Sequence, residues 1–331
     1  MPVRDEEKTL PRLLAGLSAQ AECNLARITL CIFLDGCADR SAAVLNAHAP
    51  ALPFPIMVRA AAPQPVANAG RARRAAMDIG QAALGSQDGL LLTTDADSVP
   101  ASDWIARSRA ALDVADVVAG RIIRIAAEPS RLQDRIETYY DRLCALRRQL
   151  DPVSWDDADP HHFTGGANLG FRRAAYAAIG GFQPLRSGED ATIVDDAARL
   201  GLRVRRDGAS IVQTSSRRDG RAVGGLATHL EQLDRSPEVT PRCAHPADMA
   251  WQYRMQALAR ASFDAERLDT MAGLLDLPID HLVRVARDCA NSEAFAMRIV
   301  PTPPGGIRQV GLDEAESALA ILERQPMERA A

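Results

Sequence analysis

Two carboxylates separated by one residue, Asp95 and Asp97, follow the apolar run from Leu90 to Thr94. Such a run is typical of a short buried strand, and an open α/β sheet binds its ligands at the carboxyl ends of its strands. In extended geometry both carboxylates point to the same side, so they can hold a divalent cation and leave positions open for a diphosphate. The alternative is a strand that runs into a polar turn, because Asp also favours turns and helix caps.

Composition places the chain among ordinary globular enzymes. Its 331 residues, 47% hydrophobic and 25% charged, are enough for about two domains. A net charge of −4 argues against a general nucleic-acid-binding protein. The six cysteines show no C-x-x-C spacing, and no apolar run approaches the length of about 18 residues that a membrane helix needs. We expect a cytoplasmic protein without a transmembrane segment.

Strand-like and helix-like segments alternate in the first half of the chain. Apolar spacing predicts helices over 9–19, 69–84 and 104–115, and strands over 28–34, 55–59, 90–94 and 117–125. This alternation favours an α/β fold with a mainly parallel, doubly wound sheet.

The second half contains longer helices. The pattern predicts helices over 130–149, 172–179 and 189–200, a polar loop over 151–162, and a strand over 210–213. Beyond about Arg235 the segments are helical without strands, and a Pro/Gly-rich stretch over 301–306 interrupts them. We therefore expect a first domain over 1–234 and a helical C-terminal extension over 235–331.

Seven short motifs occur in an informative order. They are Pro2-Val3-Arg4-Asp5-Glu6-Glu7, Phe33-Leu34-Asp35-Gly36-Cys37-Ala38-Asp39, Asn68-Ala69-Gly70-Arg71-Ala72-Arg73, Asp95-Ala96-Asp97, Gly165-Gly166-Ala167-Asn168, Gly180-Gly181-Phe182 and Gly188-Glu189-Asp190. Together they resemble a family 2 glycosyltransferase of the GT-A fold over about residues 2 to 225.

The resemblance implies a nucleotide site. The loop that holds Pro2, Arg4 and Glu6 would bind the nucleotide together with Asp35, whose carboxylate would accept a hydrogen bond from the base. Asn68, Gly70 and Arg71 would approach it next, with Gly70 letting the backbone come close and Arg71 facing phosphate. Asp95 and Asp97 would bind ribose and Mg²⁺ or Mn²⁺. The alternative for Arg71, Arg73 and Arg74 is the solvated face of a helix.

The resemblance also implies a sugar and acceptor site. Gly165 and Gly166 would admit a sugar ring against bare backbone, and Asn168 would either bind a sugar hydroxyl or cap the following turn. Asp190 would be the general base, with Glu189 as an acceptor or sugar ligand. The alternative for both acidic residues is a helix start, where negative charge is favourable.

Arg217 belongs to the same predicted group of sugar and acceptor residues. It lies in the polar segment 214–221, which could form a lid over the diphosphate. The alternative is a solvated basic loop.

The chain departs from the family pattern in two places. Only Pro2 and Val3 stand where the first, internal strand should be ending, and loss of that strand would leave two ladders of unpaired backbone groups. We expect either a misassigned start codon or another segment in that position. The Q-x-x-R-W motif of processive synthases is also missing, which implies transfer of a single sugar.

The sequence thus predicts a metal-dependent enzyme that moves one sugar from a nucleotide-sugar donor to a hydroxyl acceptor of unknown identity. A single displacement with Asp190 as base would invert the configuration. One alternative is a nucleotidyltransferase, although Arg4-Asp5-Glu6-Glu7 is acidic where that class would want a basic Gly-rich loop. The other is a catalytically silent nucleotide-sugar-binding or scaffold protein, against which the intact Asp95, Asp97 and Asp190 argue.

Overall fold

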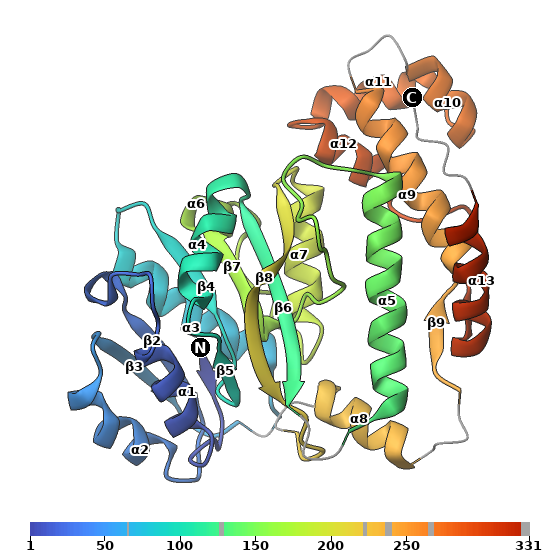
Figure 1. Ribbon diagram of the computed structural model, residues 1–331. Helices are drawn as coiled ribbons and strands as arrows, with labels where there is room; N and C mark the ends of the chain where they lie inside the picture. Colours follow the sequence, from blue (N-terminus) through green and yellow to red (C-terminus); the bar gives the residue numbers. More distant parts are fainter. Residues whose placement is uncertain (65, 126–128, 221–223, 236–239, 264–267, 326–331) are drawn as a thin grey trace. The chain divides into compact units, whose positions relative to one another are not determined.

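The computed structural model describes residues 1–64, 66–125, 129–220, 224–235, 240–263 and 268–325 (Figure 1). They divide into two compact units. Unit 1 contains Met1–Ser130, Phe163–Val194 and Arg205–Arg235, and unit 2 contains Arg131–His162, Asp195–Val204 and Ser236–Ala331.

Unit 1 opens with a parallel sheet of three short strands. Its order is β1 (Pro2–Val3), β2 (Leu30–Asp35) and β3 (Ile56–Ala61). The connecting helices are α1 (Leu10–Ser18), α2 (Ser41–His48) and α3 (Ala69–Leu84), with 3₁₀ turns at Leu25–Arg27 and Ala49–Ala51. The apolar stripe of α1, which contains Leu10, Leu13 and Leu17, packs in one cluster with β2. Helical spacing along 9–19 predicts this burial.

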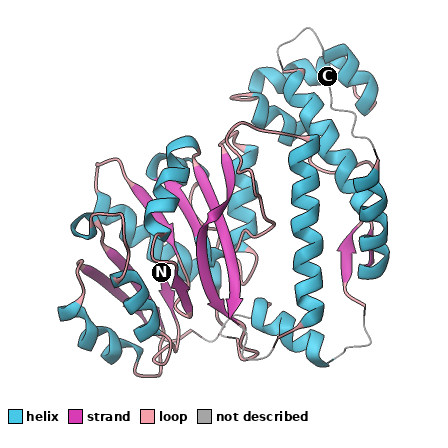
Figure 2. Ribbon diagram, viewed as in Figure 1, coloured by secondary structure: helices cyan, strands magenta, loops and turns pink. Residues whose placement is uncertain are grey.

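A second sheet of five strands completes unit 1. Its order is β4 (Leu90–Thr93), β7 (Leu169–Arg172), β6 (Val117–Ile125), β8 (Val204–Ser215) and β5 (Ser98–Pro100). β7 runs antiparallel to both β4 and β6, and β5 runs antiparallel to β8. The associated helices are α4 (Trp104–Val114), α6 (Arg173–Ile179), the start of α7 (Glu189–Arg199) and α8 (Leu226–Arg235) (Figure 2).

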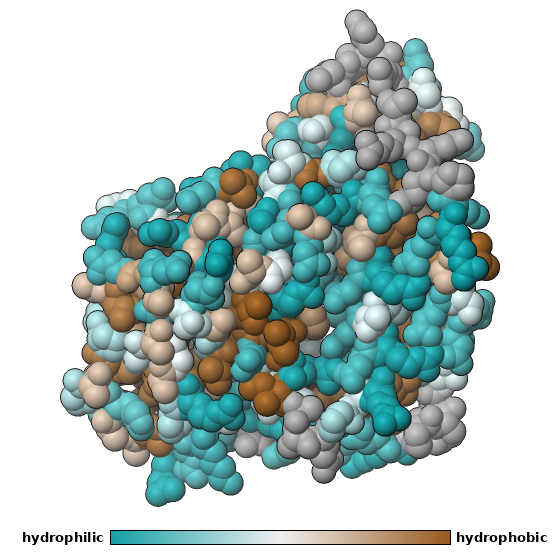
Figure 3. All heavy atoms as spheres, viewed as in Figure 1, coloured by the Kyte–Doolittle hydropathy of each residue, from teal (hydrophilic) through white to brown (hydrophobic). Residues whose placement is uncertain are grey.

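The two faces of β6 differ in their exposure to solvent. Ile123 and Ile125 are exposed, and apolar side chains gather over β6 and β8 in the space-filling view (Figure 3). Ile122 is buried on the opposite side, because successive side chains of a strand alternate between faces. A Cβ atom built on Gly165 would lie 2.8 Å from Ile122 Cδ1, so this strand supports the turn before β7.

The predicted fold class is confirmed: the chain is mixed α/β with a parallel sheet, and helices follow in its C-terminal part. The helix over 69–84 and the strand over 117–125 have the predicted bounds. In unit 1, the elements α2, α8, β5 and β7 were not predicted. They are short, and neighbouring strands stabilise β5 and β7, so little in the local sequence marks them.

A gap separates the two sheets of unit 1. β1 pairs with β2 only at Phe33 and Leu34, and β4 is the last strand of the second sheet. A cavity of about 780 Å³ lies here, lined by Met1, Leu30 and Cys31 and by Leu90–Leu92 of β4. The expectation that another segment fills this place is wrong for the described residues.

The amino group of Met1 is buried beside this cavity. It donates a hydrogen bond to the carbonyl oxygen of Cys31 at 2.7 Å. Burial lowers the pKa of this amine from 8.0 to about 5, because the charged form loses its hydration.

Unit 2 is mainly helical. It contains α5 (Arg131–Leu150), α9 (Pro246–Ala261), α10 (Leu268–Leu275), α11 (Ile279–Asp288), α12 (Ser292–Ile299) and α13 (Leu312–Arg324). Tyr139 and Leu143 of α5 pack in one cluster with Tyr253 of α9 and Leu319 of α13. α5 therefore packs with the C-terminal helices, although it lies within the predicted first domain. An unpredicted antiparallel pair, β9 (Arg242–Ala244) and β10 (Gln309–Gly311), joins them. No helix of the described residues is both long and apolar enough to cross a lipid bilayer.

Candidate active site

A buried guanidinium joins the predicted site segments. Arg73 of α3 is only 5% exposed, and its Nη1 donates to Asp95 Oδ1 at 2.9 Å and to the Gly166 carbonyl oxygen at 2.9 Å. Its Nε donates to Glu189 Oε1 at 3.2 Å. The possibility that Arg73 lies on a solvated helix face is therefore wrong. Three segments that are far apart in the sequence meet at this one side chain.

Asp190 belongs to the same group through a backbone contact. Its Oδ2 accepts a hydrogen bond from the Gly166 amide at 3.0 Å, and its Oδ1 accepts one from the Ala191 amide at 2.8 Å. Both acidic residues begin α7, where the helix dipole favours negative charge. Glu189 is 3% exposed, whereas Asp190 is only partly buried, so the two carboxylates differ in access to solvent.

The glycines before β7 are explained by packing. A Cβ atom on Gly166 would lie 2.2 Å from Arg73 Cζ, and one on Gly165 would collide with Ile122. Protein atoms thus fill both places that the side chains would need. The expected reason for these glycines, room for a sugar ring, is not the one that this geometry gives.

A second charged group adjoins the first. Arg217 donates through Nη1 to Glu6 Oε2 at 2.8 Å and through Nη2 to Glu6 Oε1, and its Nη2 lies 3.4 Å from Asp97 Oδ2. Burial raises the pKa of Asp97 to about 7, with a further contribution from Asp95, while Arg217 opposes the shift. Burial also raises the pKa of Glu189, and Arg73 opposes that shift.

These carboxylates are suited to a divalent cation. Asp95 and Asp97 offer the hard oxygen ligands that Mg²⁺ and Mn²⁺ accept. The pKa of Asp97 is raised mainly because burial removes hydration from its charged form, and the neighbouring carboxylate of Asp95 adds repulsion. A bound cation would favour the charged form of both carboxylates, so the residues fit the metal.

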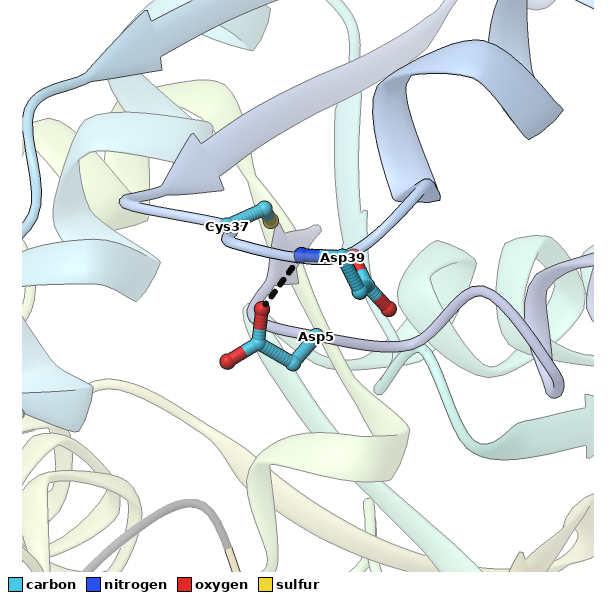
Figure 4. A group of neighbouring side chains, drawn as sticks. All are labelled: Asp5, Cys37 and Asp39. Atoms are coloured by element: carbon cyan, nitrogen blue, oxygen red, sulfur yellow. Dashed lines mark hydrogen bonds between the residues drawn. The ribbon is translucent and has the colours of Figure 1, made fainter.

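A different group of possible metal ligands was not predicted. Asp5, Cys37 and Asp39 come from the loops after β1 and β2, and one potential ligand atom of each lies within 4.8 Å of the others (Figure 4). Both carboxylates of this group already accept hydrogen bonds from backbone amides. Ala38 N donates to Asp5 at 2.7 Å, and Glu7 N donates to Asp39 at 2.8 Å. These bonds hold the two loops together, which gives the group a structural role.

The residues predicted for the base of the nucleotide lie at the carboxyl ends of β1 and β2. Arg4 Nη1 is 3.2 Å from Asp35 Oδ2, and Asp35 is buried. Pro2 is part of β1, and Glu6 is a buried partner of Arg217. Asp35 is therefore paired with the guanidinium group of Arg4 in this structure.

The start of α3 differs from the expectation. Asn68 caps the helix by accepting from Arg71 N at 2.7 Å, and it donates to the Pro184 carbonyl oxygen at 2.8 Å. A Cβ atom on Gly70 would lie 2.0 Å from the Gln183 carbonyl oxygen, so Gly70 admits this segment of the protein rather than a nucleotide. The Arg71 side chain is exposed, as the solvated alternative predicts.

Asn168 is a structural residue. It is 2% exposed, and its Oδ1 accepts from Trp104 Nε1 at 2.8 Å. Its Nδ2 donates to the carbonyl oxygens of Arg121 and Ser210 at 3.0 and 2.9 Å. These bonds use both amide hydrogens and the oxygen, so the predicted contact with a sugar hydroxyl is wrong in this structure.

Arg73 is the important residue that the sequence interpretation did not select. A helical period places it on the same face as Ala76, Met77 and Gly80, of which Ala76 and Met77 are buried. An arginine on the apolar face of a helix needs buried acidic partners. The position of Arg73 on this apolar face is the feature of the sequence that could have identified it as a buried site residue.

The chain resembles known proteins in sequence and in fold. Residues 1–180 match the model of Glycosyl transferase family 2. No curated protein matches the chain. Similar solved structures include S. aureus TarS 1–349 in complex with UDP-GlcNAc, at 13% identity over 90% of this chain and 88% of that chain, with a TM-score of 0.49.

Two further solved structures are similar to the chain. The mannosyltransferase PcManGT from Pyrobaculum calidifontis, in complex with GDP-Man and Mn²⁺, has 16% identity over 90% of this chain and 84% of that chain, with a TM-score of 0.49. A mycobacterial protein has 18% identity over 73% and 77% of the two chains, with a TM-score of 0.39. Likeness at this level carries no conclusion about ligands. Because the family model matches more than half of the residues, the chain belongs to glycosyl transferase family 2 and is a glycosyltransferase of the GT-A fold.

Proposed function

We propose that this glycosyltransferase moves one sugar from a nucleotide-sugar donor to a hydroxyl acceptor, with inversion and with a bound Mg²⁺ or Mn²⁺. The proposed catalytic part lies within residues 1–234, and the helical residues 235–331 are an extension with which α5 packs. The observation that carries the proposal is the meeting of Asp95 with Glu189 and Asp190 around Arg73 and Gly166.

Asp190 is the better of the two acidic residues for a general base. Glu189 is buried and paired with Arg73, which leaves it little access to an acceptor. Asp190 is partly exposed, and the Gly166 amide orients one of its oxygens. A carboxylate held in this way takes the proton from the acceptor hydroxyl as its oxygen attacks the sugar carbon. The bond from that carbon to phosphate breaks in the same step, and the nucleoside diphosphate leaves.

Asp95 and Asp97 are proposed to hold the cation beside the diphosphate. When bound, the cation neutralises the charge that develops on the leaving nucleoside diphosphate. Arg217, between Glu6 and Asp97, places a second positive charge close by. Arg4, Asp35 and the backbone near Pro2 are proposed to receive the base.

Calorimetric titration tests the donor site directly. UDP and GDP are titrated into the protein with and without Mn²⁺, followed by their sugar derivatives. A ligand at 100 times its dissociation constant should also stabilise the protein by about 2.7 kcal/mol. Release of nucleoside diphosphate from a bound donor supports transfer. Tight binding without release under any acceptor condition would favour the catalytically silent alternative.

A further inference from the structure

Arg73 is a buried charge that the proposed reaction does not use. The side chain is almost fully buried, and it contacts Asp95, Glu189 and Gly166 at once. A buried charge is costly unless it is fully paired. Its position on the apolar face of α3 therefore calls for an explanation beyond packing.

We propose that Arg73 is a positioning residue that holds the Gly165–Gly166 turn and the start of α7, and so keeps Asp190 aligned with the carboxylate of Asp95. The inference rests on the proposed function, because it assigns to Arg73 the support of the general base. Arg73 acts through other groups and does not itself meet the substrate.

The contact to Asp190 passes through one residue, Gly166, by way of its carbonyl oxygen and its amide. Arg73 Nη1 donates to the Gly166 carbonyl oxygen at 2.9 Å, and the Gly166 amide donates to Asp190 Oδ2 at 3.0 Å. Glu189, the neighbour of Asp190 in the chain, is held separately by Arg73 Nε at 3.2 Å. The base is thus restrained from two directions by the same guanidinium.

The shape of the guanidinium matters as well as its charge. Its planar fork meets Asp95, Gly166 and Glu189 in fixed directions, and Cζ lies 5.7 Å from the centre of the Phe182 ring. A lysine keeps the charge, but its single ammonium group cannot reproduce this fork. Because α3 is a 16-residue helix, the fork is anchored to a rigid element.

Arg73→Lys is the main test, and Arg74→Lys is the matched control. Arg74 is the next residue of the same helix, is exposed, and donates one bond to the Phe182 carbonyl oxygen at 3.3 Å. With UDP-GlcNAc and GDP-mannose as probes, we expect Arg73→Lys to lower nucleoside diphosphate release by about 10- to 100-fold, the cost of a small misplacement. Binding of UDP or GDP with Mn²⁺ should change by less than about threefold. The control should leave both unchanged.

A double-mutant cycle separates positioning from general damage. In an Asp190→Asn background, Arg73→Lys should cause no further loss of release rate, because the group that it positions is already disabled. Gly166→Ala should displace the Arg73 guanidinium, since its methyl group would lie 2.2 Å from Arg73 Cζ. Gly166→Ala should lower the release rate as much as Arg73→Lys does. The double variant that carries both substitutions should release nucleoside diphosphate no more slowly than either single variant. An equal further loss in the Asp190→Asn background would overturn the proposal.

Hydrogen exchange supplies a readout that is independent of activity. Exchange of the Gly166 amide, followed in a peptide over 163–170, should be faster in Arg73→Lys and unchanged in Arg74→Lys. Unchanged protection in Arg73→Lys would refute the positioning role. If the unmodified protein binds nucleotide but releases none from any donor, the proposed function fails, while the exchange comparison still decides what Arg73 holds.

Discussion

Capping the amino group of Met1 should stabilise the 331-residue chain by an amount that grows as the pH falls. The amine is buried beside the cavity between β2 and β4, and its pKa is lowered from 8.0 to about 5. Between these values the unfolded chain binds a proton that the folded protein does not. Stability therefore rises with pH in this window: the contribution of the neutral amine is present above pH 8 and is lost as the pH falls toward 5.

The expected size follows from the shift. Three pKa units correspond to about 4 kcal/mol in total, of which about 1 kcal/mol is felt at pH 7 and almost all at pH 5. An acetyl group removes the charge and keeps an N–H that can still donate to the Cys31 carbonyl oxygen. The adjacent cavity of about 780 Å³ has room for it.

The chain offers a clean way to make this change. Lys8 is its single lysine, so a Lys8→Arg variant leaves Met1 as the only reactive amine. The unfolded variant is acetylated and refolded, and urea unfolding is compared with that of the unmodified variant at pH 5.5, 7 and 8.5. Other titrating groups, including Asp97 with its raised pKa, are common to both samples and cancel in the difference. A stability difference that stays constant over this range would show that the amine is not buried in its neutral form.

Four further outcomes follow from the site and its supports. Asp97→Asn should weaken Mn²⁺-dependent binding of a nucleoside diphosphate by at least about tenfold while the fold survives, and unchanged affinity by calorimetry would make Asp97 a turn residue. Asp190→Asn should leave donor affinity intact and lower turnover by roughly 10² to 10⁴ fold, so release at the unmodified rate would place the base elsewhere. Asn168→Leu should lower the free energy of unfolding by about 2 to 4 kcal/mol, because it leaves buried donors and acceptors without partners; a loss below about 0.5 kcal/mol in urea would contradict this. Gly70→Ala should destabilise through collision with a backbone oxygen, whereas Gly273→Ala, where a Cβ atom meets nothing within 4 Å, should be neutral or stabilising.

Local sequence patterns were sufficient to predict the helices and strands whose own residues show a hydrophobic periodicity. The apolar stripe of α1 can be recognised from neighbouring residues alone, since side chains three or four residues apart share a helix face. The alternation of strands and helices is likewise visible in short segments of the sequence. The order of short motifs indicated the family in the same way, because each motif is contiguous in the chain. The match of residues 1–180 agrees with that interpretation.

Tertiary structure decided what each site residue touches. Asn168 and Gly70 stand in motifs that resemble ligand contacts, yet their partners are Trp104 and the segment near Gln183, far away in the sequence. Arg73 lies 93 residues from Gly166 and 116 from Glu189, and only the folded chain brings the three together. Hydrogen bonds and ion pairs act over a few ångströms in space, so residue spacing along the chain cannot reveal which distant groups will satisfy a buried charge.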